Sequence, residues 1–283
     1  RGVTSFSVSR ASDDYADLTG FNKTRLFDVV GGFKADVNVF GKEWNFEAYG
    51  SHGETRSRDF GQDLNAQNFI NAVNVTTNAA GQIVCTTAQT RPGGFAAPGG
   101  TPIADPNCVP LNVFGENRAS QAARDYIIED FVTVSEQRQT VFNANLGGAL
   151  FDLWAGPVGF NIGYEHRKEF ASFTPSDFQQ AGRGRSVPIT PLSGSYNLDE
   201  VFGELAIPLV REENGIPFIH SAQVIGRGRY SDNTVNGGFF SYTVGGNIAP
   251  IPDIEFRGNL TRSFRSPAIT ELFLPTVNTF AFV

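Results

Sequence analysis

The sequence predicts an all-β protein, an antiparallel up-and-down transmembrane β-barrel segment of about nine strands. Three observations lead to this prediction: a period-two alternation of apolar and polar residues, connections that alternate between short and long, and the composition. The 283 residues include 31 Gly and 26 Phe, and only 18% are charged. This composition suits strands with one apolar face. A membrane-crossing strand needs only about 9–11 residues and has an alternating pattern.

The clearest pair of strands begins near residue 27. Phe27, Val29 and Phe33 alternate with Asp28 and Lys34, and the alternation resumes after a short turn. Because successive side chains of a strand point to opposite faces, this pattern predicts a hairpin between two different environments. The same rhythm predicts the other strands. The expected strand segments are 3–10, 27–39, 43–48, 142–150, 158–167, 200–207, 222–230, 240–248 and 254–260.

The connections differ at the two ends of the predicted strands. The short set is 40–42, 154–156, 210–217 and 250–253, and the other set is 11–23, 56–130, 174–195 and 231–235. Short periplasmic turns and long extracellular loops are typical of outer-membrane barrels. Within the longest loop, 56–130, residues 119–130 are expected to form a short helix.

The polar strand faces carry charges on strand after strand, which suits a wet lumen better than a dry core. The charged residues expected to face the lumen are Asp28, Lys34, Asp36, Glu43, Glu47, Glu165, Arg167, Glu200, Glu204, Arg227, Arg229, Glu255 and Arg257. One interpretation is that they pair across strands and anchor a plug. The other is that some of them line a substrate path.

The charge balance bears on possible partners. Lys and Arg number 22 and Asp and Glu number 29, which gives a formal net charge of −7. Nucleic-acid-binding proteins normally present a basic face. We therefore expect no nucleic-acid partner.

The only cysteines, Cys85 and Cys108, lie in polar sequence rich in Gly and Pro. We predict that they form a disulfide, which would close a surface loop of about 24 residues. A metal or redox pair is the alternative, but it needs closer spacing or nearby histidines. A disulfide would indicate an oxidising compartment.

A search for catalytic arrangements finds little. His52, His166 and His220 are scattered without metal-ligand spacing. Glu200 and Glu204 would lie about 13 Å apart on one strand, whereas the two acids of a glycosidase lie about 5–10 Å apart. We expect no enzyme activity, no metal site and no cofactor.

Two stretches carry a more specific signal. The first is the motif Ser263, Phe264, Arg265 and Pro267, followed by Glu271, Leu272 and Phe273. The second, residues 108–115, reads Cys-Val-Pro-Leu-Asn-Val-Phe-Gly. The first resembles the Ser-x-Phe-Arg-x-Pro…Glu-Leu-Phe element of TonB-dependent outer-membrane receptors. The second resembles a long extracellular-loop motif in the proteobacterial branch of that family.

Two residues of the first motif have specific expectations. Pro267 is expected to end a strand, because proline cannot donate to the ladder. Arg265 is expected to contact the plug or the loop above it.

The resemblance implies a barrel of about 22 strands with a plugged lumen, of which about nine strands are roughly two-fifths. Nothing at the start of the chain resembles the plug or the TonB box. We therefore expect residues 1–283 to form a partial β-barrel domain, an internal segment without a plug domain. Lipid does not tolerate an open barrel edge, so the remaining strands and the plug of the receptor are expected partners.

The resemblance also implies a function. Such transporters bind a scarce nutrient (iron chelate, cobalamin or oligosaccharide) at the extracellular face and import it when TonB pulls on the plug. The implied partners are outer-membrane lipid, the TonB system and a small nutrient ligand, in the outer membrane of a Gram-negative bacterium. Substrate-binding residues stay unassigned. The alternatives are a passive barrel or adhesin, and a soluble extracellular β-sandwich or carbohydrate-binding module whose apolar faces meet.

Overall fold

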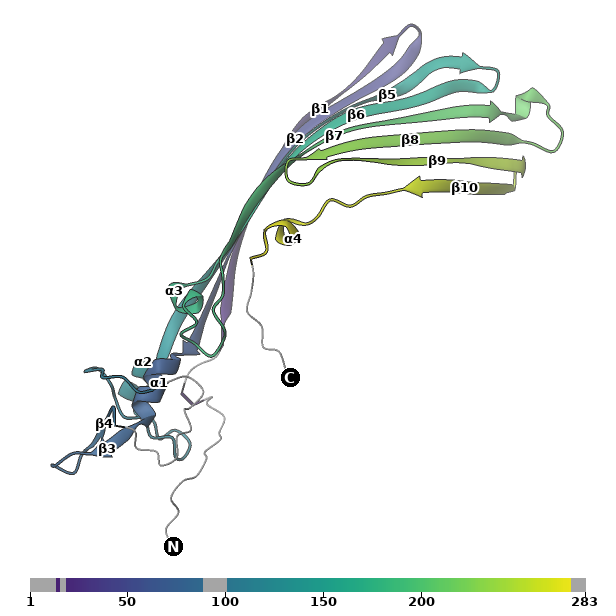
Figure 1. Cartoon of the computed structure of the whole chain (residues 1–283). Helices are drawn as coiled ribbons and strands as arrows, with labels where there is room; N and C mark the ends of the chain where they lie inside the picture. The colour runs from purple at the N-terminus through teal and green to yellow at the C-terminus, as the bar shows by residue number, and fades with distance from the viewer. Residues whose placement is uncertain (1–13, 16–18, 89–100, 276–283) are drawn as a thin grey trace.

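The computed structural model describes residues 14–15, 19–88 and 101–275, and one large antiparallel sheet dominates it (Figure 1). The sheet has eight strands in the order β1-β2-β5-β6-β7-β8-β9-β10. Their bounds are β1 Phe21–Val39, β2 Lys42–Leu64, β5 Ile128–Leu153, β6 Gly156–Thr174, β7 Leu192–Val210, β8 Ser221–Asn233, β9 Gly237–Ile251 and β10 Ile254–Arg262. Each strand pairs with the strand of this sheet that follows it in the chain, which confirms the predicted up-and-down meander. The ninth expected strand, at 3–10, lies outside the described residues.

The short connections lie at one end of the sheet, as predicted. Phe40 and Gly41 form the β1–β2 turn with φ of 51° and 80°. Two successive positive φ angles are the signature of a type I′ hairpin turn. The Asn38 side chain supports it by accepting a hydrogen bond from the Gly41 amide at 2.9 Å.

The predicted loop 56–130 is too long, because β2 continues to Leu64 and β5 begins at Ile128. In this part of β2 charged and polar residues, such as Arg56 and Ser57, occupy both faces, so the apolar alternation disappears. The backbone nevertheless stays paired, as in Leu64 with Ile128. The predicted helix at 119–130 is shorter in the structure, where α2 spans Gln121–Ile127.

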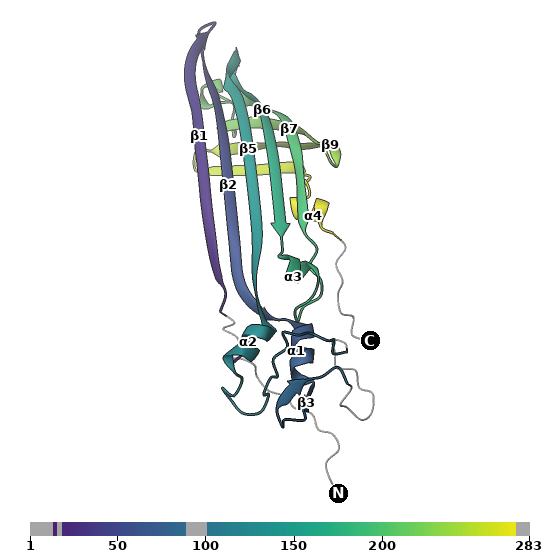
Figure 2. The same ribbon diagram turned by 90° about the vertical axis from the view of Figure 1, so that its left-hand side faces the viewer.

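The long connection between β2 and β5 folds into a small unit that we call the loop module. It consists of α1 (Ala66–Val73), β3 (Val75–Thr77), β4 (Ile83–Cys85) and α2. Figures 1 and 2 show the unit beyond the ends of β2 and β5, opposite the short turns. Elsewhere, α3 spans Asp177–Gln180, a 3₁₀ turn spans Glu212–Asn214 and α4 spans Ile269–Phe273.

The loop module has its own apolar core, whereas the described residues form no such core on the outer face of the sheet. The core residues of the module are Ala72, Leu111, Ala119, Ala123 and Ile127, and Tyr15, from before β1, packs with them. Side-chain caps begin both helices: Asn65 accepts from the Asn68 amide at 3.2 Å and Ser120 from the Ala123 amide at 3.1 Å. These caps satisfy amides that have no partner within the helix.

The strand register separates two faces of the sheet. Cross-strand partners share a face, and one row across the sheet reads Asp36, Asn45, Gly147, Asn161, Glu204, Arg227, Thr243 and Thr261. The neighbouring row on the other face reads Val37, Trp44, Gly148, Phe160, Leu205, Gly226, Val244 and Leu260. All thirteen predicted lumenal charges lie on the first face by this register, which we call the lumenal face.

The second face, which we call the outer face, is apolar and uncovered. Leu205, Val244 and Leu260 are 45%, 53% and 69% exposed. No second large sheet packs on it within the described residues, so the apolar faces do not meet as a β-sandwich would require. Such a face is suited to lipid.

No helix in the described part of the chain is both long enough and apolar enough to cross a bilayer.

The two faces give a direct prediction. Val244→Arg puts a charge in the middle of the outer face and is expected to reduce the free energy of unfolding by about 2–4 kcal/mol. Thr243→Arg, at the next residue on the lumenal face, is the matched control and should change it by less than about 1 kcal/mol. Urea unfolding of the complete barrel in lipid vesicles measures both. Equal losses for the two variants would contradict the assignment of the faces.

Candidate functional site: the lumenal face and the loop module

Ion pairs cover the lumenal face of the sheet. Arg229 Nη1 lies 2.8 Å from Glu200 Oε2, and Arg227 Nε lies 2.9 Å from Glu204 Oε2. Glu200 is only 6% exposed and also accepts a hydrogen bond from Ser231. Farther along the sheet, Lys34 Nζ lies 3.2 Å from Glu47 Oε1. The predicted pairing of charges across strands is therefore present on this face.

A hollow of about 510 Å³ lies against β6 to β10. Its lining includes Asn161, Glu204, Arg227, Arg229, Thr243 and Thr261, all of which are on the lumenal face by register. Charges of both signs and hydroxyl groups can all make hydrogen bonds to a polar surface. The arrangement can therefore hold a polar segment or a polar solute.

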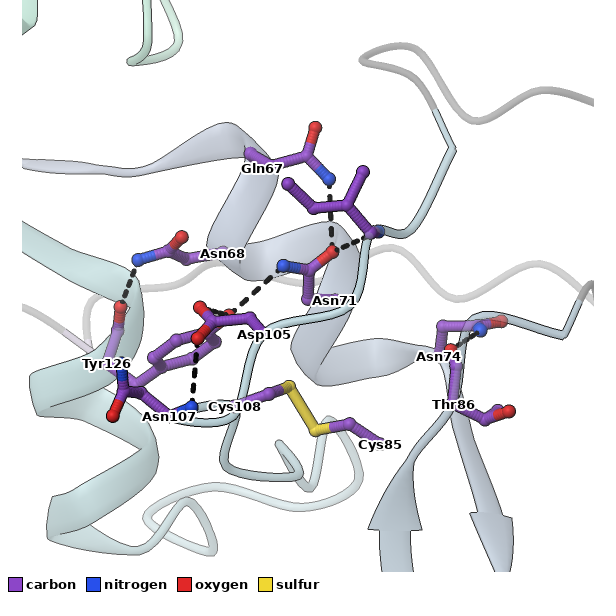
Figure 3. The surroundings of a disulfide bond; sticks show 11 residues. Gln67, Asn68, Asn71, Asn74, Cys85, Thr86, Asp105, Asn107, Cys108 and Tyr126 are labelled. Carbon is purple, nitrogen blue, oxygen red and sulfur yellow. Dashed lines mark hydrogen bonds between the residues drawn. A yellow bond between two sulfur atoms is a disulfide. The ribbon is translucent and has the colours of Figure 1, made fainter.

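The loop module is tied together covalently. Cys85, at the end of β4, and Cys108 form the predicted disulfide, with a Cα–Cα distance of 6.3 Å (Figure 3). The Leu111 amide donates to the Ala72 carbonyl at 2.8 Å, so the segment after Cys108 also joins α1. The disulfide and this bond hold the β3–β4 hairpin and residues 101–111 beside the helices.

A network centred on Tyr126 connects α1, α2 and the segment before Cys108 (Figure 3). The Tyr126 hydroxyl donates to Asp105 Oδ2 at 2.8 Å and accepts from Asn71 Nδ2 at 3.1 Å. Burial, together with the nearby Asp105 carboxylate, raises the pKa of Tyr126. Hydrogen bonds from the Asn107 amide and from Tyr126 lower the pKa of Asp105. The network therefore favours the ionised form of Asp105 and the protonated form of Tyr126.

Contacts at the base of the loop module join its two helices to each other and to the loop between β6 and β7. The Asn65 amide donates to the Ile127 carbonyl at 2.8 Å. Arg185, in the loop after α3, lies 2.6 Å from Asp63 at the end of β2, and the Ala66 amide donates to the Arg183 carbonyl at 2.9 Å. The loop between β6 and β7 thus braces the base of α1.

The motif segment, residues 263–273, leaves β10 and turns toward the lumenal face. Arg265 makes two parallel hydrogen bonds to Glu271, at 2.8 and 2.9 Å. Glu271 also accepts from the Ala268 amide at 2.7 Å. Together the guanidinium and this amide lower the pKa of the Glu271 carboxyl to about 2.

Two contacts fix the motif segment on neighbouring strands. The Asn233 side chain of β8 donates to Ser266 Oγ at 3.0 Å. The ring of Phe273 lies over Gly194 of β7, where an added Cβ would stand 2.3 Å from the ring. Gly194 is on the lumenal face, so only a residue without a side chain allows this approach.

One expectation for the motif is wrong within the described residues. β10 ends at Arg262, before Pro267, so the proline does not end the strand. Just after the end of β10, the Phe264 ring centroid lies 5.9 Å from that of Phe239, and the Arg262 guanidinium lies over the Phe264 ring. Arg265 pairs with Glu271 of its own segment, and its expected contact with a plug or the loop above stays a prediction.

Sequence reasoning missed several residues of these sites. Asn71, Asp105 and Asn233 belong to hydrogen-bond networks that join distant segments, and no local pattern marks them. Gly194 had no signal either, because the expected connection 174–195 included it, whereas β7 begins already at Leu192. No group of three or more His, Cys, Asp or Glu side chains in the described residues is placed to hold a metal ion.

A meander of long antiparallel strands, apolar outside and lined by ion pairs inside, is the wall of a transmembrane β-barrel. A family model described as TonB dependent receptor-like, beta-barrel matches residues 3–282. The chain therefore belongs to the TonB-dependent receptor β-barrel family, as the motif resemblance implied. No curated protein and no solved structure matches the chain.

The disulfide gives a prediction for the loop module. The double variant Cys85→Ser/Cys108→Ser should reduce the local stability of α1 and α2 by about 3 kcal/mol, because the open chain regains loop entropy. Hydrogen exchange of the helix amides in the complete barrel measures this change. The amides of β6 and β7 are the internal control and should keep their protection. Unchanged protection in α1 would contradict a stabilising role of the bond.

Gly194 gives a second prediction. Gly194→Ala places a methyl group inside the Phe273 ring and should weaken docking of the motif segment by about 1–3 kcal/mol. Gly203→Ala on the same strand is the control, because its nearest atom would be 3.7 Å away. Hydrogen exchange across residues 265–273 should accelerate in the first variant only. The same exchange rates in both variants would contradict the Phe273 contact.

Proposed function

We propose that this chain supplies barrel wall and extracellular loops to a TonB-dependent transporter in the outer membrane of a Gram-negative bacterium. The transporter binds a scarce nutrient, an iron chelate, cobalamin or an oligosaccharide, at its extracellular face. It then imports the nutrient by energy-coupled gating of a plug. The activity is binding and gated passage, with no catalytic step.

The observation that carries this proposal is the ion-paired lumenal face within a chain of this family. A gate must leave or rearrange without unfolding the wall around it. Wall charges such as Arg227 and Glu204 already form an ion pair, with Nε and Oε2 2.9 Å apart. Because these charges do not need the plug as a partner, the wall stays stable when the plug moves. The charged and hydroxyl side chains that line the hollow beside them can form hydrogen bonds with a plug or with a passing solute.

The loop module supports ligand capture at the extracellular end. Its disulfide and its separate core make it a pre-organised unit, and pre-organisation lowers the entropy cost of binding. The motif segment would then serve the lumenal side, since Ser266 and Phe273 hold it against β8 and β7. Further barrel strands, the plug and the TonB system are the partners that the proposal requires.

Uptake by cells tests the proposal. Cells that express the complete receptor from its own gene would be given a radiolabelled ferric chelate, cobalamin or maltooligosaccharide. We expect one of these solutes to accumulate in cells with TonB and to bind only at the surface in cells without TonB. Accumulation that does not depend on TonB would indicate a passive barrel, and it would overturn the proposed energy coupling.

A further inference from the structure

Four basic side chains form a group on the outer face of the β1–β2 hairpin. Lys23, Arg25, Arg56 and Arg58 are all exposed, and we call them the outer-face basic cluster. The register places Lys23 directly opposite Arg58 and Arg25 directly opposite Arg56. Like charges in directly opposed positions destabilise a sheet. The protein thus maintains an arrangement that an external anion would stabilise.

None of the acidic side chains near the cluster forms an ion pair with it in the described residues. Asp59 follows Arg58 in the chain but points to the lumenal face, where it accepts from Asn22. Glu136 stands opposite Arg56 on β5, yet it pairs with Arg138 at 2.9 Å. Glu54 is on the outer face as well, and it makes no ion pair with the cluster. Among the described residues, the four cations have no acidic partner.

The height of the cluster matches the lipid headgroups. Arg56 follows Trp44, at the short-turn end of the outer face, by 12 residues of β2. At about 3.3 Å per residue and a tilt of about 40°, this separation is roughly 30 Å along the barrel axis. The apolar band of such barrels is about 25 Å tall. The cluster therefore lies just above the band, at the end that carries the loop module.

Apolar and aromatic groups border the cluster on both sides. Phe27 and Val29, which follow it on the outer face of β1, are 61% and 52% exposed. Phe21 and Phe60 stack above it with ring centroids 4.5 Å apart. A soluble anion would use the cations alone, whereas a lipid would also lay its acyl chains on Phe27 and Val29.

We propose that the outer-face basic cluster binds the phosphates of a lipid headgroup in the leaflet on the loop side of the membrane. Arginine guanidinium groups bind phosphate oxygens in pairs of parallel hydrogen bonds. The site lies outside the barrel, so it is distinct from the nutrient path and does not depend on the proposed import.

Lipid binding to the complete receptor tests the proposal. The receptor would be purified in a neutral detergent, and diphosphorylated lipid A would be titrated in and followed by native mass spectrometry. Arg25→Gln/Arg56→Gln should bind roughly 30-fold more weakly, since each cation near an anionic surface is worth about fivefold in affinity. Lys34→Gln/Lys42→Gln is the matched control, because it removes the same charge from the same two strands away from the cluster.

Three further results separate the possible outcomes. Arg25→Lys/Arg56→Lys should retain most of the binding, which would show that a loss in the Gln variant is not misfolding. Without lipid, the Gln variant should melt at the same or a higher temperature, because it relieves the repulsion. Equal lipid affinity in the Gln variant and the control would overturn the proposal. So would full displacement of the lipid by inorganic phosphate at equal concentration, which would indicate a site for a soluble anion.

Discussion

The backbone hydrogen-bond ladder is the constraint on which the rest of this structure depends. In a bilayer no water can satisfy a strand's amides and carbonyls, so the strands must satisfy one another. The ladder fixes the register from β1 to β10, and the register decides the face of every side chain. One step along a strand, from Thr243 to Val244, moves from the polar row to the apolar row. A slip by one residue would exchange the two rows completely.

The two faces use their charges in different ways. On the lumenal face, Glu200 and Arg229 pair at 2.8 Å, so these charges have partners within the wall itself. On the outer face, Arg25 and Arg56 stand opposite each other without a counter-ion among the described residues. The lumenal pairs suit a channel whose gate must move. The opposed cations suit a surface that remains against anionic headgroups.

Much of the sheet could be predicted because alternation is a local signal. The neighbouring residues Phe27 and Asp28, for example, point to the outer and the lumenal face. The signal ended where β2 leaves the apolar band, since the outer face there carries Arg56 and Arg58. The contacts of the sites could not be predicted, because they join segments far apart in the chain. Tyr126 reaches Asp105 within the loop module, and the Phe273 ring lies over Gly194. Such contacts depend on the folded path and leave no periodic trace.

The most direct test of this account is to determine which residues of a single strand face lipid and which face the lumen. Spin labels placed one at a time from residue 239 to residue 248 of β9, in the complete barrel in a bilayer, would report collisions with oxygen and with a water-soluble nickel chelate. The register predicts preferential oxygen collisions at even positions such as Val244 and preferential chelate collisions at odd positions such as Thr243. Preferential oxygen collisions at the odd positions, or no alternation at all, would contradict the assignment of lipid-facing and lumenal surfaces.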